Sequence, residues 1–289
     1  MQGYLSLTSV YNEGTAVPYG SIKIASTLAW GLGYFGMPHV LLRFMAISDE
    51  NKIKLSRRIA TIWVVISMAV AVFIGIMGYT LSRQGYIDVL TGADSEKVII
   101  TIATLMSKSG VLGIVLAGLI MSGILACTMS TADSQLLVAS SSFSSDIYNT
   151  LFNKNASEKT LLNVSRITIV VVAIIACLLA LDPNSSVFEI VAHAWAGFGA
   201  TFGPVMLTSL FWKRSNKYGA LAGLITGGVM IFVWKFAISK LGGMFAIYEL
   251  LPAFLCALIA IVVVSLLTKA PEQEIVDEFE AVSAEMKQK

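Results

Sequence analysis

The feature that most constrains this chain is a series of long apolar runs, several of them nearly free of charged side chains. Runs of about 20 residues can cross the roughly 30 Å hydrocarbon core of a bilayer as α-helices. Only helices and closed barrels pair every backbone polar group in lipid. Barrel strands alternate polar and apolar residues over about ten positions, and these runs do not alternate. They predict an all-α integral membrane protein, whose first expected partner is the lipid bilayer.

Composition excludes the main soluble classes. Charged residues make up 13% of the sequence and hydrophobic residues 56%, whereas a soluble domain carries about 25% charged residues. The net charge of +2 is too small to indicate a nucleic-acid partner. No P-loop, HExxH, CxxC or Ser/His/Asp arrangement is present. We therefore expect neither an enzyme nor a nucleic-acid-binding protein.

The apolar runs predict about seven transmembrane helices. They are placed at 21–37, 59–82, 111–145, 163–181, 187–212, 218–239 and 248–267. The third is too long for one simple span, because its apolar part ends near Met129 and a hydroxyl-rich part continues to Tyr148. A short surface helix is expected at 95–106. Residues 1–267 form the predicted transmembrane domain, and residues 268–289 a charged, solvated tail.

Basic residues in the loops predict the orientation, because Lys and Arg favour the cytoplasmic side. One set of alternate loops and the tail carry most of them: Arg43, Lys52, Lys54, Arg57, Arg58, Lys154, Lys159, Arg166, Lys213, Arg214, Lys217, Lys269, Lys287 and Lys289. The opposite side has little more than Arg83, Lys97, Lys108 and Lys240. The C-terminus should be cytoplasmic and the N-terminus outside. Because no signal peptide opens the sequence, this orientation predicts further helices upstream; the alternative is a complete seven-helix protein with a directly exported N-terminus.

The first cluster that departs from an ordinary lipid-facing helix is residues 30–39. Three glycines and one proline within nine residues weaken a helix. Trp30, Tyr34 and Pro38 recur every four residues, so a helix would place all three on one face. One interpretation is a broken helix that lines a binding site. The other is a kinked helix with an interfacial aromatic anchor.

The second cluster, residues 127–135, concentrates oxygen atoms next to an apolar run. Ser130 and Thr131 offer adjacent hydroxyls, and the carbonyl of Cys127 lies one turn earlier. Asp133 is the only acid in this stretch. Hard cations prefer oxygen ligands, and acids inside membranes are usually functional. The alternative is that these hydroxyls bond back to carbonyls of their own helix.

The third cluster, residues 193–204, is rich in small residues. Small residues let helices approach closely, so helix packing is expected, with hinge motion as the alternative. Glu189 and His193 lie one turn apart, where they either pair or are solvated at the helix end.

Four segments taken together resemble the sodium:solute symporter family. They are AWGLGYFGMPHVLLRFMA (29–46), ILACTMSTADSQLLVASSSFSSDIY (124–148), AWAGFGATFGPVMLTSLFWKR (194–214) and SLFWKRSNKYGALAGLITG (209–227). The similarity is greatest to the family's proline-transporting bacterial members. It implies a LeuT-type core of two inverted five-helix repeats. The first five predicted helices would be the second repeat, followed by two further helices, and the first repeat would be missing.

The resemblance also implies site residues and an activity. Sodium-binding positions fall on Cys127, Ser130 and Thr131, and substrate-binding positions on Trp30, Tyr34 and Pro38. The implied activity is sodium-coupled symport of a small solute, expected to be L-proline, across the bacterial inner membrane. Na⁺ is the coupling ion and no cofactor is expected.

Two departures from the family pattern bear on the substrate. Met37 stands where a Gln is expected, and His193 where a Tyr is common. The alternatives are therefore a symporter for another amino acid or a pantothenate-like solute, or a truncated inactive fragment. The missing N-terminal helices of the same transporter are an expected partner, because this chain would hold half of each site.

Overall fold

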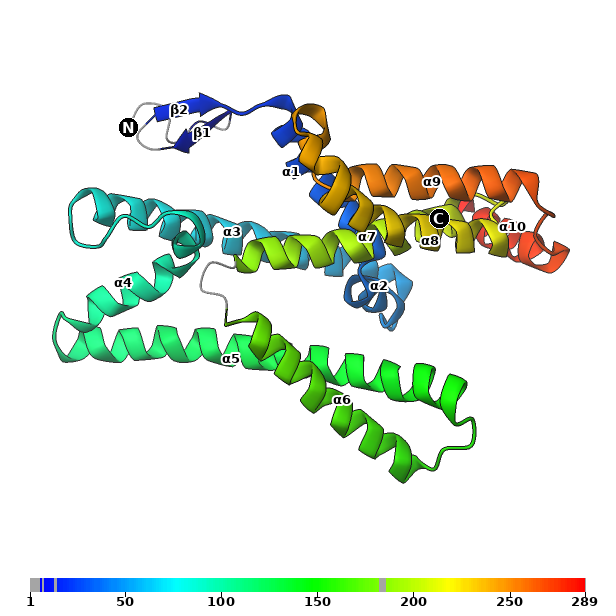
Figure 1. The fold of residues 1–289 in the computed structure, drawn as a ribbon, viewed down its shortest axis with the longest axis horizontal. Helices are drawn as coiled ribbons and strands as arrows, with labels where there is room; N and C mark the ends of the chain where they lie inside the picture. Colours follow the sequence, from blue (N-terminus) through cyan, green and yellow to red (C-terminus); the bar gives the residue numbers. More distant parts are fainter. Residues whose placement is uncertain (1–5, 7, 13–14, 182–185, 289) are drawn as a thin grey trace. The chain divides into compact units, whose positions relative to one another are not determined.

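A computed structural model of the chain describes residues 6, 8–12, 15–181 and 186–288. Apart from a short antiparallel hairpin near its start, the described part is helical (Figure 1). The hairpin pairs β1 (Ser9–Asn12) with β2 (Thr15–Pro18). The chain divides into two compact units, residues 1–57 with 188–289 and residues 58–187.

Six helices of the described part are long and apolar enough to cross a membrane. They are Ile53–Arg83, Val111–Phe152, Glu158–Leu179, Val187–Phe211, Lys217–Leu241 and Leu250–Leu267. These correspond to the second to seventh predicted spans. The predicted all-α membrane fold class is therefore confirmed.

The predicted first span, 21–37, is a broken helix. α1 (Ser21–Gly33) passes into a 3₁₀ turn, η1 (Tyr34–Gly36), and α2 (Pro38–Met45) follows. Met37 is extended between them, with φ −83° and ψ 115°. Proline disfavours the α conformation of the residue before it and suits the first position of a new helix. α1 alone is about 20 Å long, so it is too short to span the bilayer unaided.

Small residues set the packing of the first unit. Its core is formed by Ala196, Ala200, Ile231, Leu250, Ala253 and Phe254. These come from α7 (Val187–Phe211), α8 (Lys217–Val233) and α9 (Leu250–Leu267). A Cβ atom on Gly199 would lie 2.6 Å from the Cα atom of Gly33, and one on Gly227 would overlap the carbonyl oxygen of Ala200. The packing role predicted for residues 193–204 is confirmed.

The link between α8 and α9 and the tail complete the first unit. The link contains η5 (Trp234–Ile238), η6 (Ser239–Leu241) and η7 (Gly243–Ala246). Gly242 and Gly243 have φ of 70° and 58°, a region that suits residues without a Cβ atom. The tail, predicted to be solvated, forms helix α10 (Gln273–Gln288).

The second unit contains most of α3 (Ile53–Arg83), the 3₁₀ segment η3 (Gly92–Lys97), α4 (Val98–Ser107), α5 (Val111–Ser141) and α6 (Glu158–Leu179). A further short 3₁₀ turn, η2 (Glu50–Lys52), precedes α3 in the first unit. α4 is the short helix predicted at 95–106. α5 continues as a π-helix, η4 (Ser142–Phe152), to a total of 42 residues. At about 1.5 Å per residue this is roughly twice the thickness of a bilayer core, so the prediction that this run is too long for one simple span is confirmed.

Close contacts between helices in the second unit again involve glycine. A Cβ atom on Gly78 of α3 would overlap Val98 of α4, and one on Gly113 of α5 would overlap the carbonyl oxygen of Met106. In α3 and α6, no residue of the most apolar stretch of the helix is buried within the structure. These faces suit contact with lipid or with further helices.

Candidate functional site

The end of α1 carries a stack of aromatic rings around Trp30. The ring of Trp30 is stacked on Phe188 at 5.4 Å between centroids, on Trp195 at 5.5 Å and on Tyr248 at 6.0 Å. Phe188 and Trp195 come from α7, and Tyr248 from just before α9. Trp30 is therefore held by side chains far away in the sequence; Trp195, for example, is 165 residues from it. The residues around Trp30 do not by themselves specify these contacts.

Trp195 fixes the last turn of α1. Its Nε1 atom donates a hydrogen bond of 3.0 Å to the carbonyl oxygen of Trp30. Tyr34 meets the same indole edge-on, with centroids 4.7 Å apart. Gly33 lies so close that a Cβ atom there would overlap the Trp195 ring. Two of the predicted substrate-binding residues, Trp30 and Tyr34, are thus brought together against one side chain.

Pro38 does not continue this face. The helix breaks before it, and Pro38 begins α2 with an exposed side chain. The expectation that Trp30, Tyr34 and Pro38 share one helical face therefore holds only as far as Tyr34. The cause is the extended conformation of Met37, which residues before proline favour.

His193 takes part in a polar cluster that the sequence did not indicate. Its Nδ1 atom lies 3.0 Å from Oε1 of Glu249, and Nζ of Lys235 lies 3.6 Å from the same oxygen. The imidazole also meets Phe232 and Phe236 edge-on. Glu249 is 56 residues from His193 in the sequence, so no local spacing could have identified it. The cluster joins α7 to the start of α9.

Tyr248 ties the same region to α1. Its backbone N–H donates to Oγ of Ser26 at 3.0 Å, and its hydroxyl donates to the carbonyl oxygen of Ala192 at 2.5 Å. Burial, and to a lesser extent the neighbouring carboxylate of Glu249, raises the pKa of the Tyr248 phenol above its usual range. The hydroxyl is therefore held protonated, as its role as a donor requires.

The predicted sodium-binding positions lie on an unbroken stretch of α5. Oγ1 of Thr131 donates to the carbonyl oxygen of Cys127 at 3.1 Å. The hydroxyls of Thr128 and Ser134 make equivalent bonds to carbonyls four residues earlier. Back-bonding, the alternative for this cluster, is thus present at these three hydroxyls. The Ser130 hydroxyl has no partner among the described residues.

The geometry of these oxygens is also compatible with a cation. Two oxygens 3.1 Å apart can both lie about 2.4 Å from one hard cation. The hydroxyl of Thr131 donates its hydrogen to the carbonyl and keeps its lone pairs for such a contact. The carbonyl oxygen of Cys127 uses one lone pair in this bond and keeps the other. Ser130, Thr131 and Cys127 are all exposed in the structure. Within the described residues no group of three or more His, Cys, Asp or Glu side chains could hold a metal ion.

Comparison with known proteins gives a consistent result. Residues 8–227 match the model of the sodium:solute symporter family. The high-affinity proline transporter PutP of Bacillus subtilis is 41% identical over 92% of this chain and 53% of its own length. The sodium/proline symporter of Haemophilus influenzae is 41% identical over 92% of this chain and 51% of its own. That of Escherichia coli is 42% identical over 86% and 48%.

The chain spans about half the length of the curated relatives it matches. No solved structure matches it. These relatives are transporters and not enzymes.

Proposed function

Because the chain belongs to the sodium:solute symporter family, we propose that the protein containing it couples the entry of Na⁺ to the uptake of L-proline. The observation that carries this proposal is the set of relatives named as proline transporters, which are 41–42% identical over 86–92% of the chain. Bacterial relatives and six candidate spans favour the cytoplasmic membrane. The basic loops and tail favour a cytoplasmic C-terminus.

The sodium ion would bind at α5. Ser130 and Thr131 would supply hydroxyl oxygens, and Cys127 its carbonyl oxygen. The proximity of the Thr131 hydroxyl to the Cys127 carbonyl supports this assignment, as does the unpartnered hydroxyl of Ser130 among the described residues. Three oxygens are fewer than hard cations usually take, so the remaining ligands would come from other helices of the transporter.

Proline would bind at the broken first helix. Trp30 and Tyr34, fixed by Trp195, offer an apolar wall suited to a pyrrolidine ring. The interrupted backbone before Pro38 suits the charged groups of an amino acid, because a broken helix presents backbone polar groups inside the membrane. Met37, which departs from the family pattern, lies in this same segment, and His193, the second departure, precedes Trp195 by two residues on α7. A different small solute, such as another amino acid or a pantothenate-like acid, is the second candidate.

Transport would proceed by alternating access. Sodium bound at α5 would favour the state that admits substrate from outside and would thereby raise the affinity for substrate. Substrate would raise the affinity for sodium by the same factor, because coupling between binding sites is reciprocal. The first five predicted spans, which correspond to α1, α3, α5, α6 and α7, would act as one repeat of an inverted pair. The other repeat would supply the facing half of each site.

The test is uptake of radiolabelled proline by a bacterium that lacks proline transport. Two proteins are compared: this chain alone, and this chain joined to the N-terminal part of the Escherichia coli symporter. Uptake by the joined protein in Na⁺ but not in choline is the expected result. Insertion without sodium-dependent uptake by either protein would contradict the proposal. Competition by unlabelled amino acids and pantothenate then separates proline from the second candidate.

A further inference from the structure

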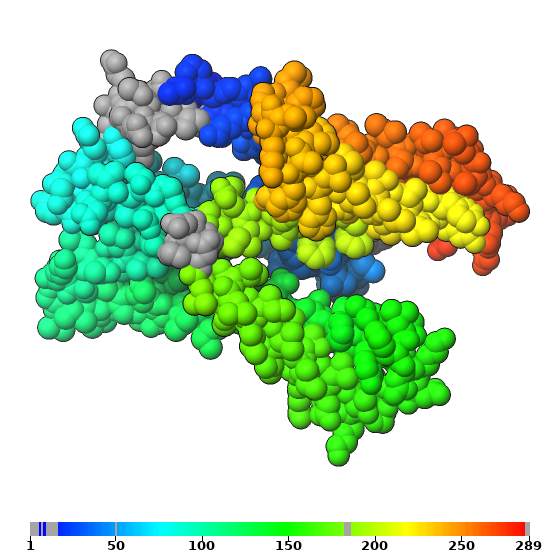
Figure 2. Space-filling model, viewed as in Figure 1, coloured from blue at the N-terminus to red at the C-terminus, as the bar shows by residue number. Residues whose placement is uncertain are grey.

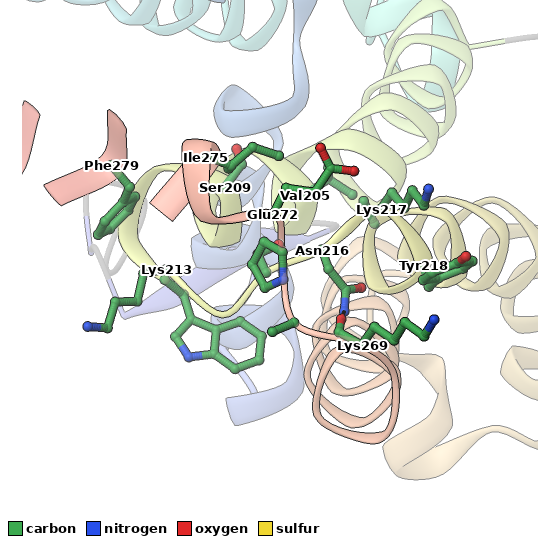
Figure 3. A pocket seen from close by; sticks show the side chains of 15 residues that line it. Val205, Ser209, Lys213, Asn216, Lys217, Tyr218, Lys269, Glu272, Ile275 and Phe279 are labelled. Carbon is green, nitrogen blue, oxygen red and sulfur yellow. Dashed lines mark hydrogen bonds between the residues drawn. The ribbon is translucent and has the colours of Figure 1, made fainter. Parts of the chain in front are cut away.

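A cavity of about 470 Å³ opens where α7 and α9 end and α8 begins, and α10 forms one of its sides (Figure 3). Its apolar lining includes Val205 of α7, Trp212 directly after α7, and Ile275 and Phe279 from α10. Three lysines, Lys213, Lys217 and Lys269, lie on its rim. A cavity that is apolar inside and basic at the edge, placed at the ends of three spans, suits a ligand that is itself amphipathic.

A network of hydrogen bonds holds the two segments that carry Lys217 and Lys269. The buried side chain of Asn216 donates from Nδ2 to Oγ1 of Thr268 at 2.8 Å and to the carbonyl oxygen of Lys269 at 2.7 Å. Its Oδ1 accepts from the backbone N–H of Gly219 at 2.9 Å. Arg214 donates to the carbonyl oxygen of Thr268 at 2.8 Å. The start of α8 and the end of α9 are therefore fixed to each other.

The charges around the cavity are not equally available. Nζ of Lys213 pairs with Glu280 of α10 at 3.0 Å, and Arg214 is directed at backbone carbonyls. Lys217 and Lys269 make no ion pair with the residues that the structure describes. In Figure 3 their side chains extend to either side of Tyr218, whereas Lys213 extends to the opposite side of the cavity. Glu272 is the one acidic residue that lines the cavity.

An apolar path leads from these two lysines along the exposed side of α8. Tyr218, Leu221, Ile225 and Phe232 are 49%, 56%, 58% and 59% exposed. Their spacing of three, four and seven residues places them on one helical face. α8 and α9 pack side by side, and the yellow and orange atoms of Figure 2 show their contiguous surface. Tyr218 and Trp212 are of the type that settles at the membrane–water boundary.

We propose that Lys217 and Lys269 bind the phosphate of an anionic phospholipid, with Tyr218 between them and an acyl chain along the exposed face of α8. Neither ammonium group is in an ion pair with a described residue, and both can attract the negatively charged oxygens of a phosphodiester, since lysine binds phosphate as a point charge. A soluble anion would leave the apolar face unused, whereas a lipid fills both. This site is distinct from the positions assigned to sodium and proline, and it does not depend on the identity of the transported solute.

The experiment is native mass spectrometry of the purified chain in detergent, with phosphatidylglycerol or phosphatidylcholine added. The wild-type chain should retain phosphatidylglycerol in preference to phosphatidylcholine. The double variant Lys217→Gln/Lys269→Gln should bind phosphatidylglycerol about tenfold more weakly or worse, because each basic residue near a membrane surface contributes about 1 kcal/mol. Lys217→Arg/Lys269→Arg should retain most of the binding, since both charges remain.

The matched control is Lys154→Gln/Lys159→Gln, which removes one exposed charge from the loop before α6 and one from the first turn of α6. It should leave lipid retention unchanged. Equal retention of phosphatidylglycerol by the wild type and by the Lys217/Lys269 double Gln variant would overturn the proposal. So would equal retention of the two lipids by the wild type, a comparison that needs no variant. Displacement of the lipid by millimolar inorganic phosphate would assign the site to a free anion instead.

Discussion

The indole nitrogen of Trp195 donates a 3.0 Å hydrogen bond to the carbonyl oxygen of Trp30, and the two rings are stacked 5.5 Å apart. A single α7 side chain thus satisfies the backbone oxygen of Trp30, near the end of α1, and also packs on the Trp30 ring. Backbone groups freed at a broken helix must find partners in a membrane. Trp195 supplies one such partner beside the break.

Replacement of Trp195 by Phe tests this bond. Phe keeps an aromatic ring but cannot donate, so the unfolding free energy should fall by about 1 kcal/mol. Thermal unfolding of the purified chain in detergent measures the change. Trp63→Phe is the control, because Trp63 is 69% exposed on α3 and should leave stability nearly unchanged. Equal effects of the two substitutions would show that the bond is not important for stability.

The close approach of α1 to α7 gives a second prediction. A Cβ atom at Gly33 would overlap the Trp195 ring, whereas one at Gly31 would meet nothing within 4 Å. Gly33→Ala should therefore lower the unfolding free energy by about 1–3 kcal/mol. Gly31→Ala, two residues away in the same helix, should be neutral or stabilising by up to about 1 kcal/mol. The same thermal unfolding assay compares them, and a Gly33→Ala variant as stable as Gly31→Ala would contradict this packing.

The elements that the sequence predicted well are those set by local properties. The third predicted span begins at 111 and α5 begins at Val111; the last ends at 267 and α9 ends at Leu267. Apolar length alone determines where a membrane helix can run. The break before Pro38 also follows from a local cause. The tail helix α10 was missed, although Ile275, Phe279, Val282 and Met286 have the spacing of one helical face.

The contacts that define the candidate site are non-local, and no sequence pattern indicated them. Trp195 and Trp30 are 165 residues apart, and His193 and Glu249 are 56 apart. Hydropathy and spacing describe a helix face but not the face it meets. Back-bonding was one of the two interpretations of residues 127–135, and the bond between Thr131 and Cys127 could be anticipated there because it lies within one helix.

The assignment of sodium to α5 gives a third prediction. In the joined transporter described above, Ser130→Ala or Thr131→Ala should weaken the apparent sodium affinity about tenfold or more, because each removes an oxygen that would contact a charged ion. Proline uptake measured across a series of Na⁺ concentrations determines the shift.

Thr128→Ala is the matched control for these variants. Its hydroxyl makes the same kind of bond, to the carbonyl oxygen of Ile124 at 2.9 Å, but it is not one of the proposed ligands. The sodium dependence of Thr128→Ala should therefore equal that of the wild type. A sodium affinity that stays unchanged in both Ser130→Ala and Thr131→Ala would remove the basis for the site.

The fourth prediction concerns Tyr248 and alkaline pH. Its pKa is raised by burial and by Glu249, so the unfolded chain, with a phenol pKa of about 10, releases this proton first as the pH rises. The stabilisation is therefore complete below about pH 10 and is lost as the pH rises towards the folded-state pKa.

Thermal unfolding measured over a series of alkaline pH values tests this. The stability of the wild type should decline above about pH 10, and the decline should be shallower in Tyr248→Phe. Near neutral pH the variant should be about 1 kcal/mol less stable, because the bond to the Ala192 carbonyl is lost. All other side chains are common to both proteins, so the difference between the two curves isolates the phenol. Parallel curves over the whole alkaline range would mean that Tyr248 does not hold its proton in the folded chain.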